Sequence, residues 1–392
     1  MGQIMSIFGG SSETMGLHFP TIDDEFRAKF NFPKIELHLH LDGAVRHSTL
    51  LELAQQKHMD LHGAKTVEDV KRLLVSHEPA NLSKVLSAFD IFLPVIRGDP
   101  TAIERVAYEF CEDQKNNGVV YFEGRYSPHL LANHILGSFV SDNVYKDQGE
   151  VTPTNVVEAV NRGFQRGKQD FGVNARSILC CIRGHEAWNH EVLEMGLSLI
   201  TATNLKELGV VAIDVAGCSH GADEQYEPSV IEVFKEAEKR GIHRTVHAGE
   251  SGGPREVVLA IEEMKAERIG HGYRLLRDPE SYRHYAIEQR MHFEGCPYSS
   301  VMTGAVPLNW PEHPIIRWVK DDVNFSLNTD DPTCFDNTIL TEMRIVQDMI
   351  GVSVEAIWKT QYNAAKSTFL PEDEKAQLVA LILEHKPSNV VV

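Results

Sequence analysis

Short apolar runs alternate with longer amphipathic stretches over most of the chain. The short runs are rich in Val, Ile and Phe, which is typical of strands buried on both faces. The longer stretches repeat apolar residues at helical spacing, as in 102–115, 228–239 and 254–265. The pattern predicts eight strands, at residues 35–42, 119–126, 177–183, 210–215, 244–247, 268–271, 292–296 and 324–328.

Eight strands separated by helices favour an α/β fold, a (β/α)8 TIM barrel with additional helices. A doubly wound sheet would place a glycine-rich turn after the first strand, and the sequence there, Gly43-Ala44-Val45-Arg46, does not supply one. We expect a single domain over 31–386, a flexible extension over 1–30 with a short helix at 22–30, and a tail over 387–392. The polar segment 137–153 is predicted to be a surface loop.

Composition and charge restrict the possible partners. The chain has 392 residues and a formal net charge of −18, which argues against binding nucleic acid or an anionic membrane surface. No apolar run is long enough for a transmembrane segment. Six cysteines without a Cys-x-x-Cys pair fit a reducing, cytoplasmic setting. Residues 1–6 match the pattern for myristoylation of Gly2, and a flexible polar leader is the alternative.

Nineteen histidines are a high count, and several fall at predicted strand ends, where barrel enzymes place their reactive groups. In the first strand, strict alternation would turn Glu36, His38, His40 and Asp42 toward the barrel interior. Polar groups pointing into a core are costly unless they are paired or bind something. A metal held by the two histidines and a hydrogen-bonded polar layer both remain open for this strand alone.

Three further strand ends carry candidate chemistry. His247 ends the fifth strand and Glu250 follows in the loop; His271 lies between two glycines at the sixth; Asp330 and Asp331 follow the eighth. Three imidazoles and a carboxylate without thiolate suit Zn²⁺, which can lower the pKa of a bound water to near 7. A second metal ion would need further ligands at the end of a middle strand. The fourth strand offers only Asp214 there, so one ion is expected.

The ordered motifs closely resemble the adenosine deaminase family. They are HLHLDG, RYSPHLLAN at 125–133, DVAG, HAGE, GHGY, CPYSS and SLNTDDP, and the likeness runs from about residue 32 to 371. The resemblance implies zinc-dependent hydrolysis of adenosine and 2′-deoxyadenosine to inosine and 2′-deoxyinosine with release of ammonia, a purine salvage reaction. It also implies a small-molecule substrate and a cytoplasmic enzyme, which we expect to be a monomer.

Residue roles follow from the resemblance, position by position. Four ligands would bind one zinc ion: His38, His40, His247 and Asp330. Glu250 would protonate the purine nitrogen beside the attacked carbon, and His271 would orient the attacking hydroxide. Three groups would bind the nucleoside: Asp42 at the ribose 5′-hydroxyl, the Gly217 N–H at one ring nitrogen, and Asp331 at an imidazole-ring nitrogen.

Two alternatives remain beside this interpretation. One is a related purine deaminase for adenine or a modified adenine nucleoside or nucleotide, although Asp42 would repel a 5′-phosphate. The other is a barrel kept as a non-catalytic binding protein. Gly124 departs from the bulkier residue that is usual in the second strand, and 218–220 replace a common acidic pair. The apolar stretch 86–93 fits either a wall over the pocket or ordinary core packing.

Overall fold

The computed structural model describes residues 21–134, 149–201, 209–217, 225–388 and 390. The Gly2 motif, Cys218 and the greater part of the predicted loop 137–153 lie outside these ranges. No helix among the described residues is long and apolar enough to cross a membrane.

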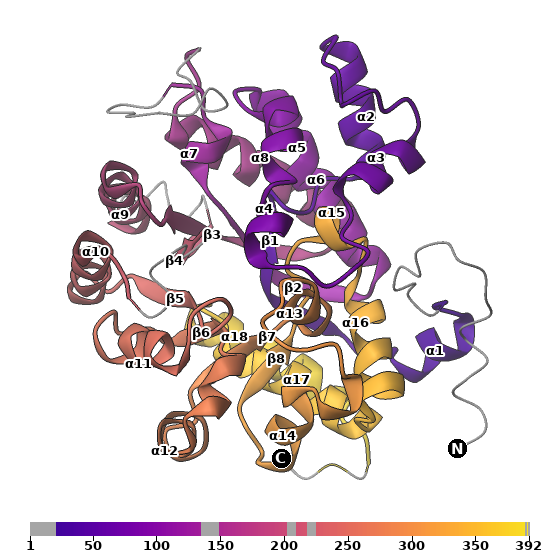
Figure 1. Cartoon of the computed structure of the whole chain (residues 1–392), viewed down its shortest axis with the longest axis vertical. Coiled ribbons are helices and arrows are strands. Elements are labelled where there is room, and N and C mark those ends of the chain that lie inside the picture. Colours follow the sequence, from indigo (N-terminus) through magenta and orange to yellow (C-terminus); the bar gives the residue numbers. More distant parts are fainter. Residues whose placement is uncertain (1–20, 135–148, 202–208, 218–224, 389, 391–392) are drawn as a thin grey trace.

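Eight parallel strands form one sheet in sequence order, surrounded by helices, which confirms the predicted (β/α)8 barrel (Figure 1). Each strand pairs in parallel with the next one from β1 to β8, with register shifts in the β1–β2 and β3–β4 pairs. A bridge between Leu39 and Asp330 closes the ring. The strands are β1 Lys34–His40, β2 Val119–Tyr126, β3 Asn174–Ile182, β4 Val210–Ala216, β5 His243–Ala248, β6 Arg268–His271, β7 His292–Gly295 and β8 Phe325–Leu327.

Helices follow each strand and pack on the outside of the barrel. Most begin at a proline or at a capping Ser, Thr, Asp or Asn, as at Thr152, whose side chain accepts from the Asn155 N–H. The helices are α1 Asp24–Lys29, α2 His47–Gln56, α3 Val67–Leu74, α4 Leu82–Leu86, α5 Phe89–Ile96, α6 Pro100–Asn116, α7 Pro128–Leu131, α8 Pro153–Phe171, α9 Glu186–Thr201, α10 Pro228–Lys239, α11 Pro254–Glu262, α12 Pro279–Ser281, α13 Pro297–Met302, α14 Pro314–Lys320, α15 Pro332–Phe335, α16 Ile339–Ile345, α17 Val354–Ser367 and α18 Glu372–Glu384.

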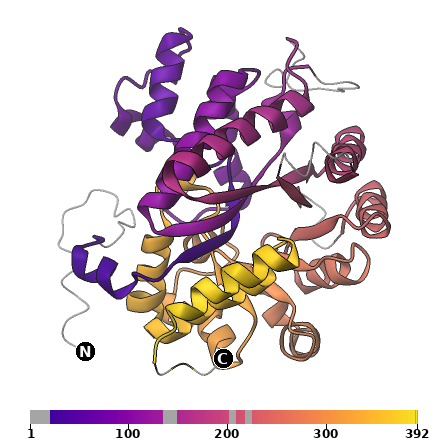
Figure 2. The ribbon, with the colours of Figure 1, turned by 180° about the vertical axis from the view of Figure 1, so that it is seen from behind.

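The short helix predicted near residues 22–30 is present as α1, and it packs on the barrel. Its Phe26 and the following Phe30 are buried. The Arg344 guanidinium lies 4.8 Å from the centre of the Phe26 ring. Figures 1 and 2 both show α1 beside α16. The order of this part of the extension therefore comes from apolar burial against the barrel.

The alternation predicted for the first strand is wrong at Glu36. The pairing of β1 with β2 shifts register between Glu36 and Leu39, which interrupts the period of two. The Glu36 carboxylate accepts bonds from the Thr329 N–H and hydroxyl, and it lines a cavity together with Gln114 of α6. Glu36 thus faces the helices, whereas His40 and Asp42 line the pocket at the barrel mouth.

Gly124, which departs from the usual family pattern, lies against three phenylalanine rings. A Cβ at this position would stand 3.2 Å from Phe110, 3.3 Å from Phe164 and 3.4 Å from Phe122. These rings fill the space between β2 and the helices α6 and α8. The glycine is therefore explained by aromatic packing behind the strand.

Candidate active site

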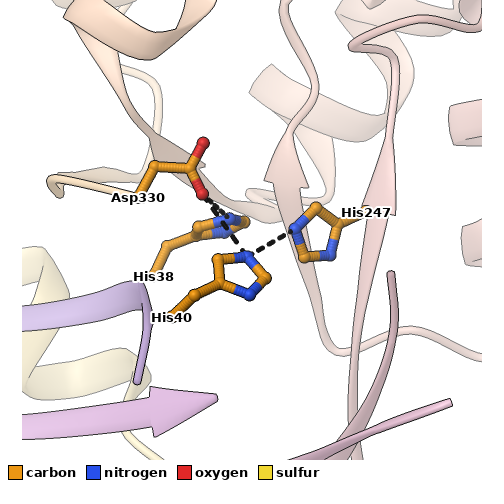
Figure 3. Close-up of side chains that lie close together, drawn as sticks. All are labelled: His38, His40, His247 and Asp330. Carbon is orange, nitrogen blue, oxygen red and sulfur yellow. Dashed lines mark hydrogen bonds and ion pairs between the residues drawn. The ribbon is translucent and has the colours of Figure 1, made fainter. Parts of the chain in front are cut away.

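Four side chains from three parts of the barrel meet at its carboxyl end. His38 and His40 come from β1, His247 from β5, and Asp330 from the turn after β8. Figure 3 shows their polar ends pointing toward one point. The His40 and His247 Nε2 atoms are 3.3 Å apart, and Asp330 Oδ1 lies 3.3 Å from His38 Nε2 and 3.4 Å from His40 Nε2. One ligand atom of each residue lies within 4.8 Å of the others.

This donor set fits a metal ion. His38 Nδ1 lies 2.7 Å from Glu294 Oε2 and His247 Nδ1 lies 2.8 Å from Asp214 Oδ2. The Glu294 carboxylate accepts from His38 Nδ1, and the Asp214 carboxylate faces His247 Nδ1 as an ion-pair partner, so that both Nε2 atoms lie toward the common centre. The buried His38 Nε2 has no hydrogen-bond partner. Imidazole nitrogens and a carboxylate oxygen, without a thiolate, are ligand types that suit zinc.

A second grouping, which exchanges His40 and His247 for His271 and Cys296, is a poorer metal site. Burial raises the pKa of the Cys296 thiol well above its usual value. The thiolate is the form that ligates metals, so binding through Cys296 would first have to displace this proton. The set of three histidines and Asp330 is therefore the stronger candidate.

A buried charge network supports the ligands from below. Arg125 of β2 donates to Asp214 Oδ2 and Glu294 Oε2, each at 2.7 Å, and all three side chains are fully buried. Arg268 of β6 donates to Glu294 Oε1 at 2.7 Å. Burial opposes ionisation of Asp214, yet the charges of His247 and Arg125 hold its pKa below the ordinary value. The two carboxylates behind the histidines are thus kept charged.

Sequence reasoning gave no role to Arg125 or Glu294, and it noted Asp214 only when a second metal was considered. The available signal was a charged residue inside a strand that is otherwise apolar. A buried charge is costly without a partner, so each one calls for an opposite charge in the interior. The pairing itself could not be predicted from the sequence, because 89 residues separate Arg125 from Asp214 and 169 residues separate Arg125 from Glu294.

Glu250 and His271 lie beside the metal ligands at the base of the pocket. His271 Nε2 is 3.6 Å from Glu250 Oε2 and 3.8 Å from Asp330 Oδ2. Burial, reinforced by the charge of Asp330, raises the pKa of Glu250 to about 8. Burial lowers the pKa of His271 well below its usual value. A protonated carboxyl therefore faces a neutral imidazole near pH 7, an arrangement that suits proton transfer.

Two of these residues have strained backbones. His271 has φ of +63° and Asp330 has φ of +66°, a left-handed conformation that non-glycine residues rarely adopt. Such strain persists where the surrounding structure fixes it, and it clusters at functional sites. At Asp330 the fixing contacts are to β1: its N–H donates to the His38 carbonyl, and its carbonyl accepts from the His40 N–H.

The remaining predicted residues line a cavity of about 370 Å³ above this cluster. Asp42 follows β1, Gly217 follows β4 with φ of +96°, and Asp331 adjoins Asp330. Asp42 Oδ2 accepts from the Ser127 N–H, whereas its Oδ1 forms no hydrogen bond and lies 3.8 Å from His40 Nδ1; Asp331 Oδ1 also forms no hydrogen bond. Burial raises the pKa of Asp42 to about 7. Burial, together with the charges of Asp330 and Asp42, also raises the pKa of Asp331 well above its usual value.

The cavity has an apolar wall from α4 and α5. Leu82, Leu86 and Phe89 line it, whereas Phe92 and Leu93 are fully buried in the core. The stretch 86–93 therefore forms part of the pocket wall on one face and packs in the core on the other. The structure brings all nine predicted site residues to one end of the barrel: His38, His40, Asp42, Gly217, His247, Glu250, His271, Asp330 and Asp331.

The chain matches known proteins over most of its length. A family model described as adenosine deaminase matches residues 33–385. An adenosine deaminase from Danio rerio is 44% identical over 355 residues, covering 91% of this chain and 96% of that protein. One from Bos taurus is 42% identical, covering 90% and 94%. One from Clostridium perfringens is 33% identical, covering 90% and 98%.

Solved structures share the fold at lower identity. An adenine deaminase from Arthrobacter aurescens superposes with a TM-score of 0.76 at 21% identity, covering 90% of this chain and 98% of that one. An amidohydrolase from Burkholderia ambifaria with bound zinc gives a TM-score of 0.77 at 22% identity, covering 93% and 94%. At these identities the likeness concerns the fold alone.

Proposed function

The chain belongs to the adenosine deaminase family, and from this premise we propose that it hydrolyses adenosine and 2′-deoxyadenosine to inosine and 2′-deoxyinosine with release of ammonia. The observation that carries the proposal is the juxtaposition of the buried Glu250 carboxyl, the His271 imidazole 3.6 Å from it and a set of metal ligands in one pocket. Relatives at 42–44% identity over about nine-tenths of the chain are adenosine deaminases, which supports this substrate class and a place in purine salvage.

A metal cofactor is supported by the family and by the donor set, and we assign it as one zinc ion. His38, His40, His247 and Asp330 would hold it. When bound, zinc supplies a positive charge that lowers the pKa of a water toward neutrality. We assign a single ion because Asp214, the candidate ligand for a second one, already pairs with His247 and Arg125.

The pocket residues divide the chemistry among them. Addition of water to the aromatic carbon requires a proton at the adjacent ring nitrogen, and Glu250 carries that proton at neutral pH. The neutral His271 imidazole accepts a hydrogen bond from the incoming nucleophile and orients it. His271 takes up the proton that the attacking water loses and returns it to the leaving amino nitrogen, while the Glu250 carboxylate takes the hydroxyl proton as the carbonyl forms, so that ammonia departs and Glu250 is protonated again.

Nucleoside binding falls to three groups around the pocket. Asp331 carries a raised pKa, so its protonated carboxyl can donate to an imidazole-ring nitrogen of the purine. The Gly217 N–H donates to a ring nitrogen on the other side. Asp42 Oδ1, which forms no hydrogen bond within the described residues, accepts from the ribose 5′-hydroxyl, and a phosphate at that position would meet a second negative charge.

The assignment of Glu250 is tested with Glu250→Gln, which keeps size and hydrogen bonding but removes the transferable proton. We expect turnover of adenosine, followed by its ultraviolet change, to fall by roughly 10²–10⁴-fold. Zinc content should stay at one ion per chain. The exposed Glu238→Gln is the matched control and should keep full activity. Wild-type turnover by Glu250→Gln would refute the role.

Substrate choice is tested by comparing kcat/KM for four compounds. We expect adenosine and 2′-deoxyadenosine to exceed adenine and adenosine monophosphate. Asp42→Asn removes the repelling charge, so it should narrow the gap between adenosine and its monophosphate. A wild-type enzyme that prefers the monophosphate would instead favour the nucleotide deaminase alternative.

The remaining assignments concern the chain as a whole. We propose a single domain over 31–386 with an extension over 1–30 and a tail over 387–392. We further propose a monomer located in the cytoplasm, which does not bind nucleic acid. The free buried thiols of Cys111, Cys180, Cys181, Cys296 and Cys334 support a reducing compartment.

A further inference from the structure

The end of β5 extends beyond its pairing with β4. The ladder between these two strands ends at the pair of Ile213 and Arg244, whereas the ladder between β5 and β6 continues as far as Ala248. Buried backbone groups are costly to leave without hydrogen-bond partners. On its β4 side, the carboxyl end of β5 therefore needs partners from outside the sheet.

Two side chains donate to the His247 carbonyl at this point. Arg183, which directly follows β3, donates from its guanidinium Nη2 at 3.1 Å. The Tyr226 hydroxyl donates to the same carbonyl at 3.0 Å. The Arg183 guanidinium also lies 4.4 Å from the centre of the Tyr226 ring, a favourable cation–π contact. The two donors therefore hold each other in place.

Glu256 of α11 extends these contacts to the turn that carries Glu250. Its Oε1 accepts from Arg183 Nη2 at 3.0 Å, and its Oε2 accepts from the Gly249 N–H at 2.8 Å. Gly249 has φ of +70°, and glycine is conformationally permissive, so the shape of the turn depends on such bonds. The contacts thus hold the backbone on both sides of Ala248, immediately before Glu250.

Arg183, Tyr226 and Glu256 together form what we call the β5 clasp. The side chains of Arg183 and Glu256 are only 7% and 2% exposed, and both line the catalytic pocket together with Glu250. Replacement of a buried ion pair by apolar residues is often neutral or stabilising, so stability alone does not account for this pair. Its contacts are instead directed at the backbone that leads to Glu250.

We propose that the β5 clasp positions Glu250 for proton transfer by fixing the turn after β5. The distance that it sets is the 3.6 Å between Glu250 Oε2 and His271 Nε2. Misplacement of a reacting group by about 1 Å can cost roughly 10²-fold in rate. The inference rests on the proposed deamination, in which Glu250 transfers protons. The position of the turn, however, can be measured without substrate.

The kinetic test uses zinc-saturated Arg183→Met with adenosine. Methionine keeps much of the volume but removes the donor to His247 and to Glu256, so we expect kcat to fall roughly 10–100-fold. KM should change by less than about threefold, because the lost contact acts on the transition state. Arg183→Lys retains one donor and should recover part of the rate. Tyr226→Phe removes one hydrogen bond and should lower kcat by about threefold to tenfold.

Arg166→Met is the matched control. Arg166 also pairs with a glutamate, Glu104 at 2.8 Å, and its guanidinium lies 4.6 Å from the centre of the Tyr108 ring, but it is 53% exposed on α8. The control should keep the wild-type kcat. A loss that appears in KM alone for Arg183→Met would overturn the proposal. Wild-type kcat in both Arg183→Met and Tyr226→Phe would overturn it too.

A crystal structure of Arg183→Met separates the proposal from the proposed reaction. We expect the turn that carries Glu250 to be displaced and its distance to His271 to change by about 1 Å. A displaced turn supports the positioning role even if the unmodified enzyme does not deaminate adenosine, a result that would refute only the proposed function. A turn in the wild-type position refutes the role. If Arg183→Met does not fold, wild-type kcat in both Arg183→Lys and Tyr226→Phe refutes it.

Discussion

Arg125→Met tests whether the buried charge network holds the metal ligands. Arg125 donates to Asp214 and Glu294 at 2.7 Å, and the three side chains have no exposed surface. Methionine keeps much of the volume and removes the charge. Among the residues that the structure describes, Asp214 then retains only His247 as an ionic partner, whereas Glu294 keeps Arg268 and His38. The variant therefore leaves one carboxylate substantially uncompensated.

The magnitude follows from that asymmetry. Removing one partner of a buried ion pair costs about 3–5 kcal/mol, and we expect one such loss because Arg268 still compensates Glu294. Loss of a group that orients a ligating histidine lowers metal affinity by roughly 10–100-fold. Both effects act through His247, whose Nδ1 lies 2.8 Å from Asp214.

Two measurements separate these effects. Urea unfolding of the metal-free protein gives the stability change, and competition with a chelator gives the zinc dissociation constant. Arg162→Met is the control, since Arg162 is about half exposed and pairs with Glu104 at the surface; it should cost less than about 1 kcal/mol. Arg125→Lys should recover part of the affinity. Wild-type stability together with wild-type zinc affinity in Arg125→Met would refute the reasoning.

Three further outcomes are expected. Gly270→Ala places a Cβ 2.7 Å from His38 Cε1, so its zinc dissociation constant should rise at least tenfold, as measured by chelator competition. Burial lowers the pKa of His313 to about 3. As the pH falls, this imidazole is therefore protonated in the unfolded chain before it is protonated in the folded protein, so stability is lost below about pH 6.5. His313→Asn, which can still cap α14, should reduce the loss of unfolding free energy between pH 7 and 5 by about 2 kcal/mol in urea titrations, and an unchanged loss would contradict this pKa. Removal of metal by a chelator should abolish adenosine turnover, and added zinc should restore it; activity that survives verified metal removal would exclude the metal-dependent mechanism.

The sequence predicted the barrel because its signals are local. Each strand is a compact apolar run, and each candidate ligand stands at the end of such a run, where a barrel gathers its loops. His247 and Asp330 could therefore be placed near one another without any knowledge of their distance. The motif order supplied the individual roles, which periodicity alone left open.

The features that escaped prediction depend on contacts between distant segments. The register shift in β1 that turns Glu36 outward arises from pairing with β2, and nothing in the local pattern marks it. The bond between Arg125 and Glu294 spans 169 residues. The helices α2 to α5 between β1 and α6 also went largely unpredicted, although α4 and α5 form the wall of the substrate pocket.

Asp330 links closure of the barrel to the chemistry at its mouth. Its backbone N–H and carbonyl bond to His38 and His40, which joins the end of β8 to β1. The same residue directs Oδ1 at those two histidines, and its Oδ2 accepts from Ser299 at 2.6 Å. The positive φ that permits both contacts is stable only while they persist. Ordering of this strand seam and ordering of the ligand set are therefore a single event.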